Sequence, residues 1–284
     1  MLFIKAIEGN KCLIVDTATD EGYWKSSDEV MHSNKFVLGK KEGILEPVTN
    51  SEILQYFLIS RKLAGDRSLI FSFTSYDDYA SVSCDDEFRS SITDSVVPYG
   101  VTSLDDNCFY NCIALRRVQL PKTLVSLGKG CFYACGELRD IELPTSVREV
   151  GTYCFRKCFN LKEITVPLGV ECISDSCFSD CMSLENIELP DTVTYLGESS
   201  FNGCFLLRSI KIPNSVVEIQ DNCFFGCESL KEVTVPKSVR YVGRSAFADT
   251  SALEVLRLPY KLRYVSDPSK NFYGVSSLCE IEYY

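Results

Sequence analysis

Cysteine is the residue type whose number and spacing could most readily do chemistry in this chain of 284 residues. Fifteen cysteines are present, and most of them form C-x-x-x-C pairs. Thiolates at such short spacing could bind zinc, form disulfides or act as nucleophiles. The five pairs are Cys108/Cys112, Cys131/Cys135, Cys154/Cys158, Cys177/Cys181 and Cys223/Cys227.

Related positions further along the chain argue against a metal site. Ser200 and Ala246 stand where the first cysteine of a pair would fall, and Thr250 stands where the second would. A ligand set would not lose its sulfurs in register, whereas buried cysteines that pack as small hydrophobic residues tolerate such replacements. We therefore expect a first and a second ladder of reduced, structural cysteines, with no metal and no cofactor.

The rest of the composition excludes other kinds of chemistry. His32 is the only histidine and lies in a polar stretch typical of a solvated side chain, so no histidine pair can form. No phosphate-binding glycine loop or nucleophile elbow occurs. We predict that the protein is not an enzyme. Activity confined to the N-terminal region, with Cys12, His32 or nearby acids lining a pocket, is the least favoured alternative.

Charge and hydropathy limit the partners and the location. The net charge of −10 argues against nucleic acid, which needs a basic surface. No apolar run is long enough to span a membrane. The first residues lack the basic and long apolar segments of a secretory signal, so we expect a cytoplasmic protein. A cell-surface or secreted location is the alternative if a signal has been removed.

Three unrelated residue types repeat with one period of 23 residues, which marks the elements that position the cysteines. Leucine follows the period from Leu115 to Leu253. The prolines are Pro98, Pro121, Pro144, Pro167, Pro190, Pro213, Pro236 and Pro259, and the phenylalanines are Phe109, Phe132, Phe155, Phe178, Phe201, Phe224 and Phe247.

One unit predicts its own local structure. Ile141-x-Leu143 alternates as a short strand with both apolar side chains inward, and Pro144 ends it. Val147 to Gly151 is expected to be a second extended or turn segment on an opposite wall. Phe132 to Leu138 has helical or 3₁₀-like spacing that closes the coil. A single unit cannot bury its apolar edge, so the units must stack, Phe on Phe and Cys on Cys.

The unit pattern C-F-x-x-C-x-x-L-x-x-I-x-L-P-x-x-V-x-x-I-G resembles the 23-residue BspA-like (Treponema-type) leucine-rich repeat. The resemblance extends from Val96 to Tyr284. It implies an α/β solenoid, a curved right-handed leucine-rich-repeat coil with a parallel sheet. The position before Phe, usually Ala in that family, is Cys in five of seven units. Many similar proteins are bacterial or protozoan surface proteins implicated in adhesion and host interaction.

The domain organisation follows from where the period holds. Residues 96–284 form the solenoid, about eight units, and residues 1–95 form a small α+β N-terminal or capping region. In that region we expect a hairpin of residues 2–7 and 12–16, a helix after the capping box at Thr49, and a strand of residues 68–75. Two residues are inserted between Val265 and Phe272, and we expect this insertion and the terminal tyrosines to cap the solenoid.

Two surfaces are candidate protein-binding sites. The first is the strand row, the residues that alternation turns outward from the concave sheet. The second is the Tyr/Arg surface on the opposite wall, whose residue types dominate binding hot spots. The strand row comprises Gln119, Glu142, Thr165, Glu188, Lys211, Thr234 and Arg257; the Tyr/Arg surface comprises Tyr195, Tyr241, Tyr264, Arg240 and Arg263.

Neither surface excludes an ordinary structural reading. The strand row could be a solvated face, and the tyrosines could cover the edges of the apolar stack with arginines stacked on them. We predict a non-catalytic interaction module or scaffold that binds a protein partner through its solenoid surface. The alternative is a surface or secreted adhesin that binds host or matrix proteins.

Overall fold

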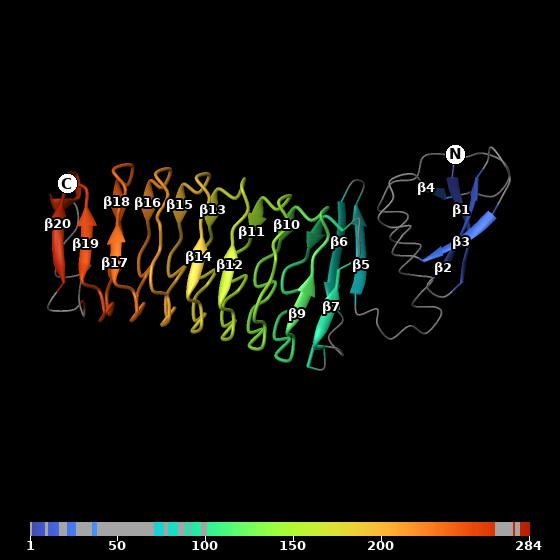
Figure 1. Cartoon of the computed structure of the whole chain (residues 1–284), viewed down its shortest axis with the longest axis horizontal. Coiled ribbons are helices and arrows are strands. Elements are labelled where there is room, and N and C mark those ends of the chain that lie inside the picture. The colour runs from blue at the N-terminus through green and yellow to red at the C-terminus, as the bar shows by residue number, and fades with distance from the viewer. Residues whose placement is uncertain are drawn as a thin grey trace.

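A computed structural model describes residues 2–8, 11–16, 22–26, 36–38, 71–76, 79–84, 89–90, 92–97, 101–264, 275 and 279–284. Most of these residues form a solenoid in which successive units lie side by side along the long axis of the molecule (Figure 1). Each coil has three sides: a first strand, a second strand and a face of turns. The parallel-sheet solenoid expected from the repeat is confirmed.

The first wall is built from the I-x-L segments, which pair in parallel one repeat apart, with Glu163 opposite Asn186. Ile164 is buried between two exposed neighbours, because side chains alternate across a strand. Ile141 and Leu143 are buried as expected, although their unit forms no regular strand. The strands of this wall are β7 (Asp94–Val96), β9 (Arg117–Gln119), β12 (Glu163–Thr165), β14 (Asn186–Glu188), β17 (Glu232–Thr234), β19 (Val255–Leu258) and β20 (Glu280–Tyr283).

The second wall confirms that the segment before the repeated glycine is extended. Its two-residue strands also pair in parallel, with Cys172 opposite Tyr195. Coils approach so closely after these strands that a β-carbon on Gly243 would lie 2.3 Å from the backbone nitrogen of Asp221. The strands are β8 (Ser103–Leu104), β10 (Ser126–Leu127), β11 (Glu149–Val150), β13 (Cys172–Ile173), β15 (Tyr195–Leu196), β16 (Glu218–Ile219) and β18 (Tyr241–Val242).

The turn face, which carries the C-F-x-x-C segments, has 3₁₀-like hydrogen bonds but no helix. The N–H groups of Cys135 and Leu138 donate to the carbonyls three residues earlier, of Phe132 and Cys135. Gly130 and Ala134 interrupt the pattern with φ of 59° and 57°. Their N–H groups donate instead to the next coil, at 2.8 Å each. Residues with left-handed backbone thus replace the expected helical segment with turns, and the hydrogen bonds of these turns link neighbouring coils.

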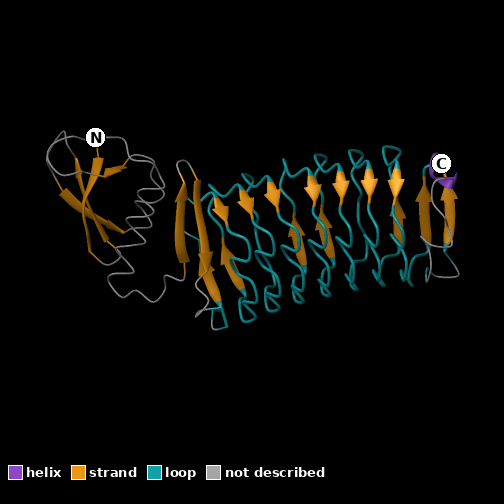
Figure 2. Cartoon of the chain, turned by 180° about the vertical axis from the view of Figure 1, so that it is seen from behind, coloured by secondary structure: helices purple, strands orange, loops and turns teal. Residues whose placement is uncertain are grey.

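Helix is almost absent from the described residues, so the α/β label of the expected fold is loose. The one helix among them is the 3₁₀ helix η2 (Tyr260–Tyr264), drawn in purple near the C-terminus (Figure 2). Turns replace the helices that would close each coil of an α/β solenoid. The helix expected after Thr49 lies outside the described residues.

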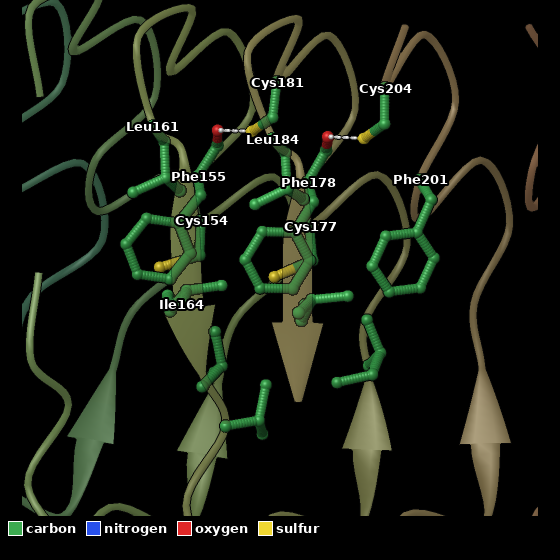
Figure 3. Close-up of a cluster of buried hydrophobic side chains, with 14 of the residues drawn as sticks. Cys154, Phe155, Leu161, Ile164, Cys177, Phe178, Cys181, Leu184, Phe201 and Cys204 are labelled. Atoms are coloured by element: carbon green, nitrogen blue, oxygen red, sulfur yellow. Dashed lines mark hydrogen bonds between the residues drawn. The ribbon is translucent and has the colours of Figure 1, made fainter. Parts of the chain in front are cut away.

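The core is a set of stacked columns of identical side chains. The seven repeated phenylalanines are at most 1% exposed, and neighbouring rings lie 5.1–5.6 Å apart and within 12° of parallel. Phe155, Phe178 and Phe201 show this stack in Figure 3. Each stacked pair adds about 0.5–1.5 kcal/mol beyond the burial of its apolar area. Every coil therefore stabilises the next by the same contact.

Strands outside the 23-residue period continue the walls at the N-terminal end. The antiparallel hairpin β5 (Phe71–Tyr76) and β6 (Tyr79–Cys84) extends the second wall, because β6 pairs with β8. The strand expected over residues 68–75 is β5, three residues later at its start. The Arg89 guanidinium donates to the carbonyls of Asn107, Cys108 and Tyr110 on the first turn. The proposed division near residue 95 remains a prediction.

The first wall stays in register across the insertion at the C-terminal end. Strand β20 pairs with β19 with Glu280 opposite Val255, a step of 25 residues that equals one repeat plus the two inserted residues. Tyr284 folds back over two coils, where its hydroxyl donates to the Val235 carbonyl at 2.8 Å and Lys237 lies over its ring. This part of the expected cap is formed; the insertion lies outside the described residues.

The first strands of the chain form a separate sheet. Strands β1 (Leu2–Glu8) and β2 (Lys11–Asp16) are antiparallel, which confirms the expected hairpin. Strand β3 (Gly22–Ser26) pairs with β2, and β4 (Phe36–Leu38) pairs in parallel with β1. His32 lies outside the described residues, so its expected solvation is untested.

Candidate protein-binding surfaces

The second cysteine ladder has a defined hydrogen-bonding role inside the core. The Cys181 thiol donates to the Phe155 carbonyl of the preceding coil at 3.1 Å, and the Cys204 thiol donates to the Phe178 carbonyl at 3.2 Å (Figure 3). Cys135, Cys158 and Cys227 make equivalent bonds at 3.1–3.2 Å. Each thiol therefore satisfies a buried carbonyl between coils.

The first ladder consists of side chains that contact one another. Ser200 Oγ lies 3.2 Å from Cys223 Sγ, and both side chains are fully buried. Burial, followed by hydrogen bonding to Cys108 and Cys154, raises the pKa of the Cys131 thiol well above its usual value. Burial also raises the pKa of Cys223 to about 12. Thiols held protonated at neutral pH are poor nucleophiles and poor metal ligands, which supports their structural role.

The described residues gather no set of three His, Cys, Asp or Glu side chains suited to a metal ion. Both cysteine ladders are occupied by free thiols in the described part of the chain. A depression on the second wall, beside Asp105, Asp106 and Glu149, is open to solvent. It gives no enclosed, water-excluding site of the kind that catalysis uses.

The strand row lies on the first wall as alternation predicts. Its members from Gln119 to Thr234 are all exposed. Arg257 is half-buried, because it forms ion pairs with Glu232 on β17 and Glu282 on β20. The row is therefore available to a partner over most of its length, and its last arginine is engaged within the protein.

The Tyr/Arg surface is less continuous than its sequence positions suggest. Tyr195 on β15 and Tyr241 on β18 are two coils apart, and Glu218 on β16 lies between them in register. The Tyr241 hydroxyl donates to Asp221 Oδ1 at 3.3 Å, and the residue is 40% exposed. Burial, and then the neighbouring Asp175, raise the pKa of Tyr195. A carboxylate thus interrupts the aromatic row.

The basic members of this surface are only partly placed. Arg240 is exposed at the start of the second-wall segment. Arg263 and Tyr264 belong to η2, and their side chains lie outside what the structure describes. The cation–π contacts found in the described residues involve Lys129 and Arg156 over Tyr153, Lys157 over Tyr133, and Lys237 over Tyr284.

A third surface was missed by the repeat consensus. The position that follows the second cysteine carries a large apolar side chain in four coils, and these side chains are 38–53% exposed. We call them, with one neighbour, the apolar stripe: Ile113, Phe159, Met182, Phe205 and Leu206. The consensus treats this position as variable. Comparing the units column by column would have revealed it.

Comparison with known proteins identifies the family of the repeat solenoid. The family described as BspA type leucine rich repeat region matches residues 86–208 and 196–284, with six copies of its repeat. The chain belongs to the BspA-type leucine-rich-repeat family. The resemblance stated from the repeat pattern is thereby confirmed. Among curated proteins, none matches the chain.

Solved structures of leucine-rich-repeat proteins share the fold. A leucine-rich-repeat protein from T. pallidum is 29% identical with a TM-score of 0.60, over 65% of this chain and 88% of that one. One from Bacteroides ovatus is 25% identical with a TM-score of 0.56, over 69% of this chain and 55% of that one. One from Eubacterium ventriosum, 20% identical, has a TM-score of 0.53 over 64% and 50%. The chain thus spans about half the length of two of these proteins.

The BspA-type solenoid is built from strands and turns. Among the residues that the structure describes, no helix has the length and apolar character needed to cross a membrane. A role in protein interaction or adhesion is typical of the family.

Proposed function

We propose that this BspA-type repeat protein is a non-catalytic module that binds a protein partner through its solenoid surface. The observation that supports the proposal most directly is the rigid spacing of the surface columns. Because the phenylalanine stack fixes neighbouring coils 5.1–5.6 Å apart, each outward position recurs at nearly the same interval from coil to coil. Pre-organised rows of this kind lose little entropy when a partner binds.

The chemistry of the described surface also favours binding over catalysis. The cysteines of the two ladders are buried, and burial raises the pKa of Cys223 to about 12. The depression beside Asp105 and Glu149 is open to solvent. The exposed strand row and the Tyr/Arg surface supply varied polar and aromatic side chains, which can distinguish one partner from another. Whether the partner is intracellular, as for a scaffold, or a host or matrix protein, as for an adhesin, depends on the compartment in which the protein acts.

The test is affinity capture followed by quantitative binding. The full chain is used to capture partners from a lysate of the source organism and from host extracellular proteins. Each captured protein is purified and titrated calorimetrically against wild type, the Tyr195→Ala/Tyr241→Ala/Tyr264→Ala variant and the Glu142→Ala/Glu188→Ala/Lys211→Ala variant. Tyr110→Ala, an exposed tyrosine on the turn face, is the matched control.

The outcomes distinguish the two surfaces. A loss of affinity of about tenfold or more in one variant, with Tyr110→Ala unchanged, assigns binding to that surface. The compartment of the partner then separates scaffold from adhesin. The proposal fails if no purified protein binds the folded wild-type chain.

A further inference from the structure

We propose that the apolar stripe docks an amphipathic α-helix of a partner protein, with acidic residues along one flank of that helix. The inference rests on the proposed function and specifies the partner chemistry of one surface. It stands on three observations: the continuity of the stripe, its axial spacing and the charge beside it.

The stripe follows one column of adjacent coils, and hydrogen bonds link neighbouring coils at two of its four steps. The Asn160 N–H donates to the Gly136 carbonyl, and the Ser183 N–H donates to the Phe159 carbonyl, both at 3.2 Å. Gly136 leaves a gap in the column, but Phe159 leans over it: a β-carbon on Gly136 would lie 3.4 Å from the Phe159 ring.

The stripe also has clear ends. The positions one repeat before Ile113 and one repeat after Phe205 are the exposed polar residues Ser90 and Glu228. Single exposed apolar side chains are ordinary, but a contiguous row rimmed by polar residues marks an interaction site.

The axial spacing of the stripe matches an α-helix rather than a strand. The coils beneath it are 5.1–5.6 Å apart at their phenylalanine rings. An α-helix advances about 5.4 Å per turn, so a helix along the stripe offers one apolar side chain to each coil. An extended strand advances about 6.7 Å per two residues and loses register by about one coil over the stripe. The stripe spans four coil steps, which corresponds to a helix of about 15 residues.

The charge beside the stripe determines which helix fits. The residue three positions after the stripe position is basic in five coils, and all five side chains are exposed: Arg116, Arg139, Lys162, Arg208 and Lys231. Glu185 interrupts this basic rim but is paired with Arg208 at 3.4 Å. Glu137, which lies next to the stripe position of its coil, accepts a hydrogen bond from Asn160. On a chain of net charge −10, this rim favours a helix with an acidic flank.

The test uses a defined peptide and fluorescence anisotropy. The peptide has about 15 residues, is stapled to hold a helix, and carries leucines on one face and glutamates along one flank. Two control peptides have lysine in place of glutamate, or alternate leucine and glutamate as an extended strand. We expect the acidic helix to bind the full chain at least about tenfold more tightly than either control.

Matched variants locate the binding. Met182→Glu/Phe205→Glu should weaken binding of the acidic helix at least about tenfold, and Arg139→Glu/Lys162→Glu about fivefold with a smaller salt dependence. Leu168→Glu/Val125→Glu, at exposed apolar positions away from the stripe, should change it less than about twofold. Circular dichroism of each variant confirms that it is folded.

Several results would overturn the inference. Equal binding of the lysine helix removes the charge argument, and equal binding of the alternating peptide removes the spacing argument. Dimerisation of wild type through the stripe, measured by sedimentation and lost in Met182→Glu/Phe205→Glu, would make the occupant a second copy. If a partner from the capture experiment binds this variant as well as wild type, the proposed function stands and the helix-docking inference fails.

Discussion

The buried positions of the coils form inner columns, and the exposed positions form outer columns. The residue type varies less from coil to coil in the inner columns than in the outer ones. The repeated Phe is present in every one of seven coils, and the second cysteine ladder changes only at Thr250. The strand row instead carries a different kind of side chain in almost every coil, as Gln119, Glu142 and Thr165 show. An inner side chain must fit its copies above and below, whereas an outer side chain meets water. The inner columns therefore specify the coil, and the outer columns are free to specify a partner.

High pH should destabilise the fold through the buried thiols of the inner columns, and this is the largest effect that we expect. Burial raises the pKa of Cys131 and Cys177, and that of Cys223 to about 12, against about 8.5 in an unfolded chain. The folded chain holds protons that the unfolded chain releases, so this stability is complete below about pH 8.5 and is lost as the pH rises toward the folded-state pKa. Each such thiol contributes up to about 1.4 kcal/mol per pH unit. Urea unfolding between pH 7.5 and 10.5, with reductant present, measures the slope.

A variant with fewer ladder thiols is the control for this titration. Cys131→Ala/Cys177→Ala/Cys223→Ala uses the residue that the chain itself has at Ala246. Its unfolding free energy should be lower at pH 7.5 but should fall less steeply with pH. An identical slope in wild type and variant would show that these three thiols do not titrate with unfolding.

Truncation of one stacked ring should have the next largest effect. Phe178→Ala removes a ring stacked on both sides, at 5.5 and 5.6 Å, and leaves a cavity. We expect a loss of about 3–5 kcal/mol in the free energy of unfolding. Glu188→Ala, in the strand row of the same repeat unit, should stay within about 0.5 kcal/mol. Urea denaturation of both variants measures the two losses of unfolding free energy. Similar losses would contradict the prediction.

Adding a β-carbon where coils approach closely on the second wall should cause an intermediate loss of stability. A β-carbon on Gly243 would lie 2.3 Å from the nitrogen of Asp221 and 2.5 Å from the carbonyl carbon of Gln220, both backbone atoms that cannot swing away. Gly243→Ala should cost about 1–3 kcal/mol. Gln220→Ala, in the same column one coil earlier, already has a β-carbon and should be nearly neutral. Equal thermal shifts in the two variants would refute the steric argument.

The inner columns are what the sequence could predict. Three residue types with one period determine the coil, because each repeated apolar position has to be buried against its own copy. The pairing step of 25 residues at Val255 and Glu280 likewise follows from the two inserted residues. The turn face was harder. Phe132 to Leu138 has helical spacing. Left-handed backbone at Gly130 and Ala134 instead directs their N–H groups to the next coil, and the spacing of apolar residues does not predict this conformation.

The outer surfaces were less predictable. Residue type alone grouped Tyr195 with Tyr241, but the register places Glu218 between them. The apolar stripe was overlooked because Met182 and Phe205 occupy a position that the consensus leaves open. A consensus records what the coils share, whereas a binding surface depends on how they differ.

Removing a thiol from the second cysteine ladder should cost slightly more unfolding free energy than removing one from the first. This difference is the smallest effect that we expect to measure. Cys177→Ala and Cys181→Ala remove the same sulfur from equally buried sites. Of these two thiols, that of Cys181 donates to the Phe155 carbonyl. That carbonyl also accepts a hydrogen bond from the Cys158 N–H, which remains after the Cys181→Ala substitution. Because that carbonyl is not left wholly unsatisfied, we expect Cys181→Ala to be the more destabilising by only about 0.5–1 kcal/mol. Cys181→Ser, which retains a donor, should recover part of this difference, and Cys177→Ser should resemble the native Ser200. Paired urea titrations resolve differences of this size. If Cys181→Ala were no worse than Cys177→Ala, the thiol-to-carbonyl bond would have no net effect, and the second ladder would be kept, like the first, by packing alone.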